Sequence, residues 1–418
     1  MALRSAKAFA LRAPAPSTIV SIAIIAAVAA MVAVANWRDV RRSRAVFSRP
    51  LASGTRGAGT TREDLRARIV DLRARVAARP EDIGLAVTLA DALVRQTRIT
   101  GNTGLAIEAE AALTRALVAD PGNYDANREL GSLLLSQHRF REAVSAGEKN
   151  RDARPYDAIN YGIIGDGHLE LGEYDQAFAA FDKMMSLRPS AASYARVAYA
   201  RELQGNLTGA VESMTLAADA TAPEYAEALA WHHAQVGDLY LRLGKLHEAD
   251  AAYVASSHAF PGHPFAMTGY ARLLAARGER SSALALLQEL AKTAPTPDLA
   301  ARTGDLLESL GRHDEAERQY ALAESGWRVD APEPKNLARF LAEHNRRIPE
   351  AVAIAEKAAS ERRDIFTEDA LAWAYFKAGR LSAAREAIAQ ALRTGSKDAD
   401  IHAHAKAIEA ATGQAAAR

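Results

Sequence analysis

Small and large apolar positions along this chain repeat with a period of about 34 residues, beginning near residue 83. One period leads from Leu130–Gly131 to Ile164–Gly165, and from Pro155 to Pro189. A fixed period of this length indicates that each unit is one helix–turn–helix, which cannot bury its apolar face alone and therefore stacks on its neighbours. The pattern predicts a solenoid with a long groove, which favours a protein that holds other proteins over an enzyme.

Each unit places residues of defined size at fixed positions. Large residues stand at positions 4, 7, 11 and 24, small residues at 8 and 20, Gly at 15 and Pro at 32. Small residues let the two helices of a hairpin cross closely, Gly tolerates the left-handed angle of the turn, and Pro stops the second helix. The clearest unit shows this with Gly165, Gly172, Phe181 and Pro189. The units start near residues 83, 124, 158, 191, 230, 264, 297, 332 and 365.

This set of positions resembles the tetratricopeptide repeat family over residues 83–398 of the 418. The resemblance implies an all-α, right-handed α-solenoid of about nine helix hairpins. It further implies a protein–protein interaction scaffold that binds a partner segment in its concave groove, although this family serves many different partners.

Three units depart from the pattern. The first carries an insertion around Thr97–Gly104, which we expect to form an extended loop. The residues 222–224 are expected to start an elongated helix that runs to Leu243. The unit at 332 has Arg346 where the turn glycine belongs, and Pro349 opens its second helix.

Residues 1–37 are typical of a signal peptide or membrane anchor. Every residue from Ile19 to Ala35 except Ser21 is apolar, which is near the lower length limit for a spanning helix. Residues 33–35 have the small-x-small form of a signal-peptidase site, which favours cleavage after Ala35. Positive charge directly after this segment resists translocation and favours a retained anchor instead. It comes from Arg38, Arg41, Arg42, Arg44 and Arg49.

Both alternatives place the protein at a bacterial cell envelope, either anchored in the inner membrane or exported to the periplasm, with the orientation left open. Residues 1–80 hold 15 Lys/Arg and 4 Asp/Glu, which leaves −10 for the rest of a chain whose net charge is +1. This asymmetry fits an anionic lipid surface near the N-terminus, but basic flanks also accompany most membrane-inserted segments.

Three further segments flank the repeats. Residues 38–62 are expected to form a flexible basic linker, and residues 63–82 an N-terminal capping helix. Residues 399–418 are expected to form a C-terminal capping helix and tail. One side of that last helix is predicted to be polar, with His402, His404, Lys406 and Glu409.

The sequence offers little for catalysis or for cofactors. There is no cysteine, which excludes disulfides, thiolate metal sites and cysteine nucleophiles. No phosphate-binding loop or zinc-protease motif is present. The adjacent His232 and His233 point in different directions on a helix, and His402 and His404 are too far apart around a helix to share a metal. We therefore expect no catalytic residue, no cofactor, no metal and no enzyme activity.

In the family that this chain resembles, position 9 of the first helix faces the concave side. The resemblance places the acids Asp91, Asp166, Asp238 and Asp305 there, together with Arg272. It also places Arg128 on the concave side, at position 5 of its unit. Acids at this position indicate a groove that attracts basic segments, unless they only solvate a helix face. The family's clamp for peptide carboxylates needs Lys at position 5 and Asn at position 9. Here Arg128 is paired with Ser132, and Gly162 with Asp166, so the clamp is not expected.

Four aromatic residues of the last two units map to the same inner face: Phe340, Phe366, Trp373 and Phe376. Large aromatics on a concave surface are typical anchors for a bound segment. Core packing is the alternative, because Trp373 lies in a run with several buried positions.

The sequence as a whole predicts an interaction scaffold whose partners are other proteins. Membrane contact is expected through residues 19–35 unless they are removed, and no nucleic acid is expected. The alternative is a periplasmic, chaperone-like factor for assembly or cofactor maturation of a membrane complex.

Overall fold

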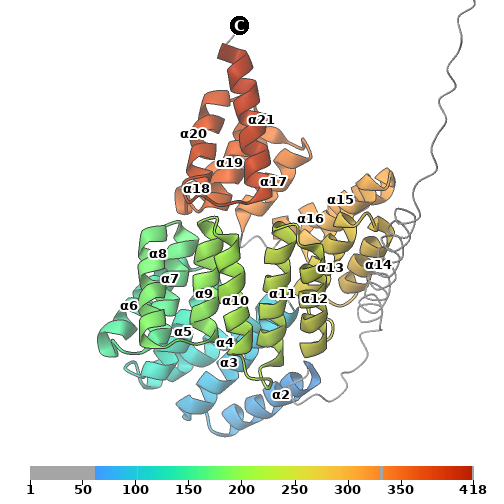
Figure 1. The fold of residues 1–418 in the computed structure, drawn as a ribbon. Coiled ribbons are helices and arrows are strands. Elements are labelled where there is room, and N and C mark those ends of the chain that lie inside the picture. The colour runs from blue at the N-terminus through green and yellow to red at the C-terminus, as the bar shows by residue number, and fades with distance from the viewer. Residues whose placement is uncertain (1–61, 101, 330–332, 417–418) are drawn as a thin grey trace, which may run out of the picture. The chain divides into compact units, whose positions relative to one another are not determined.

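A computed structural model describes residues 62–100, 102–329 and 333–416. This part of the chain forms 20 helices and contains no strand (Figure 1). They are α2 (Arg62–Ala78), α3 (Ile83–Thr100), α4 (Thr103–Ala119), α5 (Tyr124–Ser136), α6 (Phe140–Ala153), α7 (Ala158–Leu171), α8 (Tyr174–Leu187), α9 (Ala191–Leu203), α10 (Leu207–Asp219), α11 (Ala226–Arg242), α12 (Leu246–Ala259), α13 (Pro264–Ala276), α14 (Arg280–Ala291), α15 (Pro297–Ser309), α16 (His313–Val329), α17 (Pro334–Glu343), α18 (Ile348–Glu361), α19 (Ile365–Lys377), α20 (Leu381–Ala391) and α21 (Ala399–Ala416).

Consecutive helices pack as hairpins, as the 34-residue period predicts. Each odd-numbered helix from α3 to α19 packs on the even-numbered helix that follows it. First helices of neighbouring units also contact each other, for example α3 with α5 and α11 with α13. The all-α solenoid expected from the sequence is therefore confirmed. We call the side of the solenoid that the first helices form the inner face.

The helix crossings explain why small residues recur at position 8. A Cβ atom on Gly165 of α7 would overlap the ring of Phe181 on α8. Gly304 meets Tyr320 in the same way, on α15 and α16. Phe181 and Tyr320 are both buried, so the bulky residue at position 24 fills the space that the missing Cβ leaves.

The turn between α17 and α18 forms without the usual glycine. In the clearest unit, Gly172 adopts φ = 79° between α7 and α8. In the unit at 332, Asn345 and Arg347 adopt φ of 51° and 40° on either side of Arg346. Asparagine tolerates this region better than most residues, so the turn keeps its geometry at some cost in backbone strain.

The insertion in the first unit is not an extended loop. Helix α3 continues to Thr100 and α4 begins at Thr103, so that only two residues separate the helices. Ile99 is buried, and the hydroxyls of Thr97 and Thr100 donate to carbonyls one turn earlier. Burial of Ile99 extends the helix through the insertion.

The start of the elongated helix also differs from the prediction. Helix α11 begins at Ala226, because residues 222–225 form a turn in which the Tyr225 N–H donates to the Ala222 carbonyl. The helix ends at Arg242, one residue before the predicted end.

The C-terminal helices contact the middle of the chain as well as their sequence neighbours. The Arg363 N–H donates to the Leu171 carbonyl at 3.3 Å, and the Ile365 N–H donates to the hydroxyl of Tyr174 at 2.9 Å. A Cβ on Gly172 would overlap the backbone of Arg363. The loop between α18 and α19 thus lies on the turn between α7 and α8, an arrangement that no repeat period predicts.

The predicted signal or anchor segment of residues 1–37 lies outside the described residues, as does nearly all of the predicted linker. Among the helices that the structure describes, none has the length and apolarity needed to cross a membrane.

Candidate protein-binding site

Ion pairs connect the first helices of successive units along the inner face. The guanidinium of Arg196 on α9 donates to both carboxylate oxygens of Asp166 on α7, at 2.9 and 2.6 Å. Arg272 on α13 lies 2.5 Å from Asp238 on α11. Stacking with a 34-residue period places equivalent positions of neighbouring units side by side, so such pairs form between units.

The negative charges of the four acids predicted at position 9 are therefore largely balanced by cationic side chains of the same chain. Asp166 and Asp238 face arginines, and Asp305 lies 3.4 Å from His344, the residue that follows α17. Asp91 is exposed, and its carboxylate is 3.9 Å from Arg95 of its own helix. Because most of these carboxylates have a cationic partner, the four acids by themselves do not create an acidic surface.

Two of these acids also hold a tyrosine of their own hairpin. Tyr253 of α12 donates its hydroxyl proton to Asp238, and Tyr320 of α16 donates to Asp305 at 3.1 Å. Burial and the neighbouring carboxylate raise the pKa of both phenols. The signal was present in the sequence, since both units combine Asp at position 9 with Tyr at position 24. The unit of Asp166 has phenylalanine at position 24.

The two predicted arginines are paired as well. Arg128 of α5 lies 3.1 Å from Asp157 and 3.4 Å from Asp125. Arg272 donates to Asp238, as described above, and keeps part of its side chain exposed. The structure thus brings Arg272 and Asp238 together and leaves Arg128 at a separate place on the inner face.

Phe340 does not line a groove. Its side chain is only 2% exposed, and its ring packs against the rings of Tyr320, Trp327 and His344, with centroids 4.6 to 5.8 Å apart. The alternative interpretation, core packing, is correct for this residue. Position 9 of this unit points toward the core because α16 brings two large aromatic residues against α17.

The remaining predicted aromatics are half-buried on the same core cluster as Phe340. Trp373 of α19 stacks on the ring of His404 of α21, with centroids 4.0 Å apart and planes at 14°. Trp373 also stacks on Phe376 at 4.9 Å, and Phe366 lies under the ammonium of Lys335. The inner face of the last unit is therefore partly covered by the chain's own C-terminal helix.

His404 corrects the prediction of a polar side on that helix. Its side chain is buried, and Nδ1 lies 2.9 Å from the carboxylate of Asp369, which is itself buried on α19. His402 differs, because its ring reaches the carbonyl of Ser396 in the loop before the helix. The stacking on Trp373 and the bond to Asp369 turn one of the two histidines toward the core.

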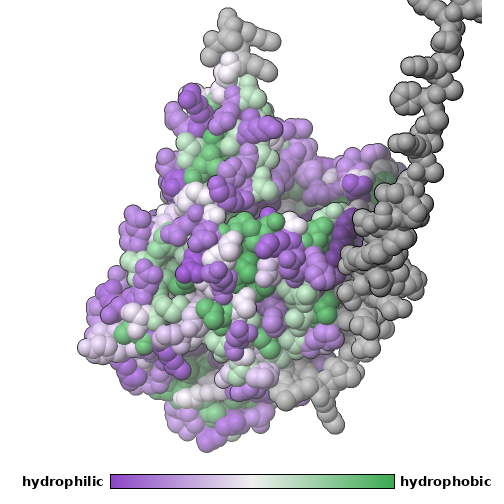
Figure 2. Space-filling view, in the orientation of Figure 1, coloured by the Kyte–Doolittle hydropathy of each residue, from purple (hydrophilic) through white to green (hydrophobic). Residues whose placement is uncertain are grey.

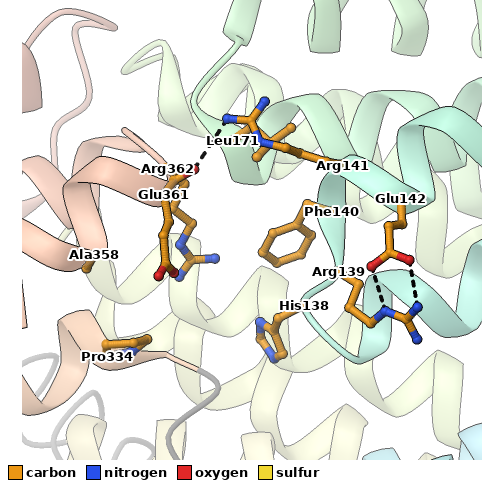
Figure 3. A pocket seen from close by; sticks show the side chains of 10 residues that line it. All are labelled: His138, Arg139, Phe140, Arg141, Glu142, Leu171, Pro334, Ala358, Glu361 and Arg362. Atoms are coloured by element: carbon orange, nitrogen blue, oxygen red, sulfur yellow. Dashed lines mark hydrogen bonds and ion pairs between the residues drawn. The ribbon is translucent and has the colours of Figure 1, made fainter.

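A pocket of about 210 Å³ lies between the α5–α6 turn and the end of α18 (Figure 3). Phe140 and Leu171 form its apolar wall, and Arg139 in its rim is paired with Glu142 at 2.6 Å. None of the ten predicted groove residues, all of them described, is among the residues that line it. The residues that line the pocket are His138, Arg139, Phe140, Arg141, Glu142, Leu171, Pro334, Ala358, Glu361 and Arg362.

A partly buried charge network lies beside this pocket. His138 is 2.6 Å from Glu333, and the largely buried Arg362 also contacts Glu333. Burial raises the pKa of Glu170, which lies 3.4 Å from Arg362. Burial alone would also raise the pKa of Asp364, but Lys335 and a hydrogen bond lower it below its usual value. These paired charges join the C-terminal helices to the middle of the chain, so the pocket is primarily part of that junction.

The described residues contain no group of three or more His, Asp or Glu side chains placed to hold a metal ion. What the inner face offers chemically is a row of polar and charged side chains on consecutive first helices.

Comparisons with known proteins agree with the repeat pattern. A family model described as tetratricopeptide repeat matches residues 107–158, 237–298 and 271–328. An Hsp70-Hsp90 organizing protein from Triticum aestivum is 32% identical over 83 residues, which are 20% of this chain and 14% of that relative.

Two solved structures are similar in fold. The APC/C hetero-tetramer Cut9-Hcn1 is 15% identical with a TM-score of 0.52, and the match covers 88% of this chain and 62% of that one. The human IFIT1 dimer with m7Gppp-AAAA is 14% identical with a TM-score of 0.53, covering 79% of this chain and 77% of that one. This chain thus spans less than two thirds of the plant relative and of the Cut9-Hcn1 chain.

At these identities, the solved structures establish the fold alone. Tetratricopeptide repeats build protein–protein interaction scaffolds. The repeat positions, the helix hairpins and the matching family model together show that this chain contains tetratricopeptide repeats, which the family model matches over residues 107–158 and 237–328.

Proposed function

We propose that this protein is a scaffold that binds a segment of a partner protein along the inner face of its first helices. The observation that carries the proposal is that side chains of one unit pair with those of the next on this face, as Asp166 does with Arg196 and Asp238 with Arg272. A partner segment that crosses several units meets polar groups held at fixed spacing by these pairs.

The surface character agrees with recognition by polar contacts. Figure 2 shows hydrophilic and hydrophobic side chains interspersed over the visible face. The large exposed apolar residues belong to many different helices, among them Ile107 on α4, Leu216 on α10 and Leu322 on α16. Such scattered residues do not form the large apolar patch that marks an obligate interface.

In this proposal the protein acts at a bacterial cell envelope, tethered or exported through residues 19–35. The apolar run of these residues and the arginines that follow support the assignment. N-terminal sequencing of the mature protein distinguishes the two forms. A new N-terminus directly after Ala35 shows export with cleavage, whereas an intact N-terminus in the membrane fraction shows an anchor. An uncleaved protein found entirely in the cytosolic fraction would contradict both.

Site-specific photocrosslinking in the organism that encodes the chain tests the binding function. A photoreactive residue is placed at Asp91 or at Asp305, which lie on the inner face of the first and seventh units and are both exposed. The control position is Arg318, which is exposed on α16, the second helix of its hairpin.

We expect both inner positions to capture the same protein and the control position to capture none of it. Identical products from Asp305 and Arg318 would contradict binding along the inner face.

A further inference from the structure

The pocket between the α5–α6 turn and the end of α18 has a fixed apolar wall and an opening to solvent (Figure 3). Phe140, Leu171 and Ala358 of this wall are each at most 9% exposed, and Pro334 completes it. The guanidinium carbon of Arg362 lies 5.3 Å from the centroid of the Phe140 ring, which holds the ring in its place. A wall that is already ordered can receive an apolar group without a further loss of side-chain freedom.

The volume of the pocket is suited to one large side chain. It amounts to about 210 Å³. In another protein, an apolar cavity of about 150 Å³ is large enough to bind benzene. The ring of a phenylalanine, or the side chain of a leucine or methionine, can therefore enter this pocket.

Two charged side chains that line the pocket have no ion pair with any residue that the structure describes. Arg141 is exposed and donates from Nη2 to the backbone carbonyl of Glu361 at 3.4 Å. The carboxylate of Glu361 is exposed as well. Arg139 differs, because it lies 2.6 Å from both Glu110 and Glu142. The pocket thus offers one cation and one anion beside its apolar wall.

The walls of the pocket come from two parts of the chain that are distant in sequence. Residues 138–142 and 171 belong to the units at 124 and 158, whereas residues 334 and 358–362 belong to the unit at 332. These parts are joined nearby by the hydrogen bond between the Arg363 N–H and the Leu171 carbonyl. A group that fills the pocket touches both parts and therefore stabilises the arrangement in which they meet.

Resting on the proposed function, we infer that this pocket binds one large apolar side chain of the partner segment, flanked by an acidic residue that pairs with Arg141 and a basic residue that pairs with Glu361. The complementary charges favour a polypeptide, since neighbouring residues of a peptide supply opposite charges on the two sides of an apolar residue. A nucleic acid or an anionic lipid surface presents repeated negative charge, which the carboxylate of Glu361 repels. The pocket is then a second contact for the partner, separate from the inner face.

Ligand-observed NMR on the full chain tests this inference, because the method detects weak binding of short peptides. The probes are the capped peptides Gly-Glu-Phe-Lys-Gly and Gly-Lys-Phe-Glu-Gly, which cover both chain directions. We expect one of them to bind. Replacement of its Phe by Ala should weaken binding by about tenfold or more, since burial of the apolar side chain supplies most of the affinity.

Ala358→Leu tests the wall of the pocket. The larger side chain fills the space from the wall and should abolish binding of the peptide. Ala353→Leu is the matched control, because Ala353 is exposed on the same helix. It should leave the affinity unchanged. Circular dichroism checks that each variant keeps its helical content.

Arg141→Glu tests the charges without changing the wall. The variant should bind the peptide about fivefold more weakly, because a like charge replaces the cation. Exchange of the peptide's Glu for Lys should restore binding to this variant. Arg318→Glu is the control, an equal charge change at an exposed arginine on α16. It should change the affinity by about twofold at most, because a remote exposed charge is screened.

Three results would overturn the inference: equal affinities of the Phe and Ala peptides, unchanged binding by a folded Ala358→Leu variant, or binding of free phenylalanine as tight as that of the peptide. Failure of the inference is distinguishable from failure of the proposed function. A partner captured from Asp91 and Asp305 together with no affinity for the peptides leaves the scaffold function standing. Peptide binding in the pocket without such capture leaves only the pocket.

Discussion

The hydroxyl of Tyr174 accepts a 2.9 Å hydrogen bond from the backbone N–H of Ile365, which lies 191 positions later in the chain. Tyr174 begins α8 and Ile365 begins α19, and both are buried. A backbone N–H in the first turn of a helix has no partner within that helix. The contact between the C-terminal helices and the middle of the chain therefore satisfies a donor that would otherwise be buried without an acceptor.

Tyr174→Phe should destabilise this contact. The substitution keeps the ring but leaves the buried N–H of Ile365 without its acceptor, which costs about 1–3 kcal/mol. Hydrogen exchange followed by mass spectrometry should show faster exchange at the start of α19. Tyr156→Phe serves as the control, because Tyr156 is 84% exposed. Equal effects of the two substitutions would show that the Tyr174 hydroxyl contributes nothing to the junction.

Gly165→Leu should destabilise the hairpin of α7 and α8. Even a single added carbon at this position would overlap the ring of Phe181, and overpacking of this kind costs about 1–3 kcal/mol. Urea unfolding monitored by circular dichroism measures the change. Gly413→Leu on α21 is the matched control, since no heavy atom lies within 4 Å of a Cβ added there. If both variants unfold at the parent's urea concentration, the assignment of the crossing point is wrong.

Trp373→Ala should loosen α21 while the other hairpins stay folded. The indole stacks on His404, so its removal takes away the contact that covers the inner face of the last unit. We expect faster hydrogen exchange along α21 and unchanged exchange in α5 to α14. His404→Ala should have a similar effect, because it removes the same stack and the bond to Asp369.

His402→Ala is the control for this pair, since His402 is exposed and its ring nitrogen lies 2.9 Å from the carbonyl of Ser396, in the loop before α21. An effect of His402→Ala as large as that of His404→Ala would contradict the role of the stack. That Phe366 and Trp373 anchor a partner segment, so that Phe366→Ala and Trp373→Ala weaken its binding, stays a prediction. Loss of α21 now offers a second route to such a weakening.

His232 should make the fold less stable in mild acid. Burial, followed by the charge of His233, lowers the pKa of His232 from 6.5 to about 4. The unfolded chain therefore binds a proton that the folded chain rejects between these two values. The contribution of His232 to the free energy of unfolding is fully present above about pH 6.5. It is lost as the pH is lowered toward 4, by roughly 2–3 kcal/mol.

Urea unfolding at a series of pH values between 7 and 4 measures this loss. His232→Leu should flatten the dependence of unfolding free energy on pH, since the titrating group is gone. His258→Leu provides the comparison, because His258 is exposed on α12 and its removal should leave the slope unchanged. A slope that is identical in the two variants would contradict the assignment to His232.

The sequence alone determined the repeat, the pairing of helices and the packing inside each hairpin. Gly165 and Phe181 lie 16 positions apart in the same unit, and their contact follows from helix geometry and a period that every unit obeys. The turn at Gly172 and the stop at Pro189 are equally local. Each depends on the backbone preference of one residue, which can be predicted from the residue type alone.

The conformation of the first-unit insertion and the pairing of the acids at position 9 depended on neighbouring helices as well as on the local sequence. Thr97–Gly104 looked like a loop, yet burial of Ile99 extends α3 through most of it. The acids at position 9 were expected to attract basic segments, but Asp166 and Asp238 pair with Arg196 and Arg272 of the next units. Whether ion pairs form between neighbouring units depends on how the units stack and on the length of the side chains. The sequence of a single repeat does not encode this.

Tertiary structure alone decided what covers the inner face and what stays open on it. Phe340 is buried because α16 supplies Tyr320 and Trp327, and Trp373 is covered because α21 supplies His404. Asp91 and Asp305 stay exposed on the same face. Tyr174 and Ile365 are far apart in the sequence, and their contact depends on how all the hairpins between them stack. No local or periodic pattern in the sequence specifies the result of that stacking.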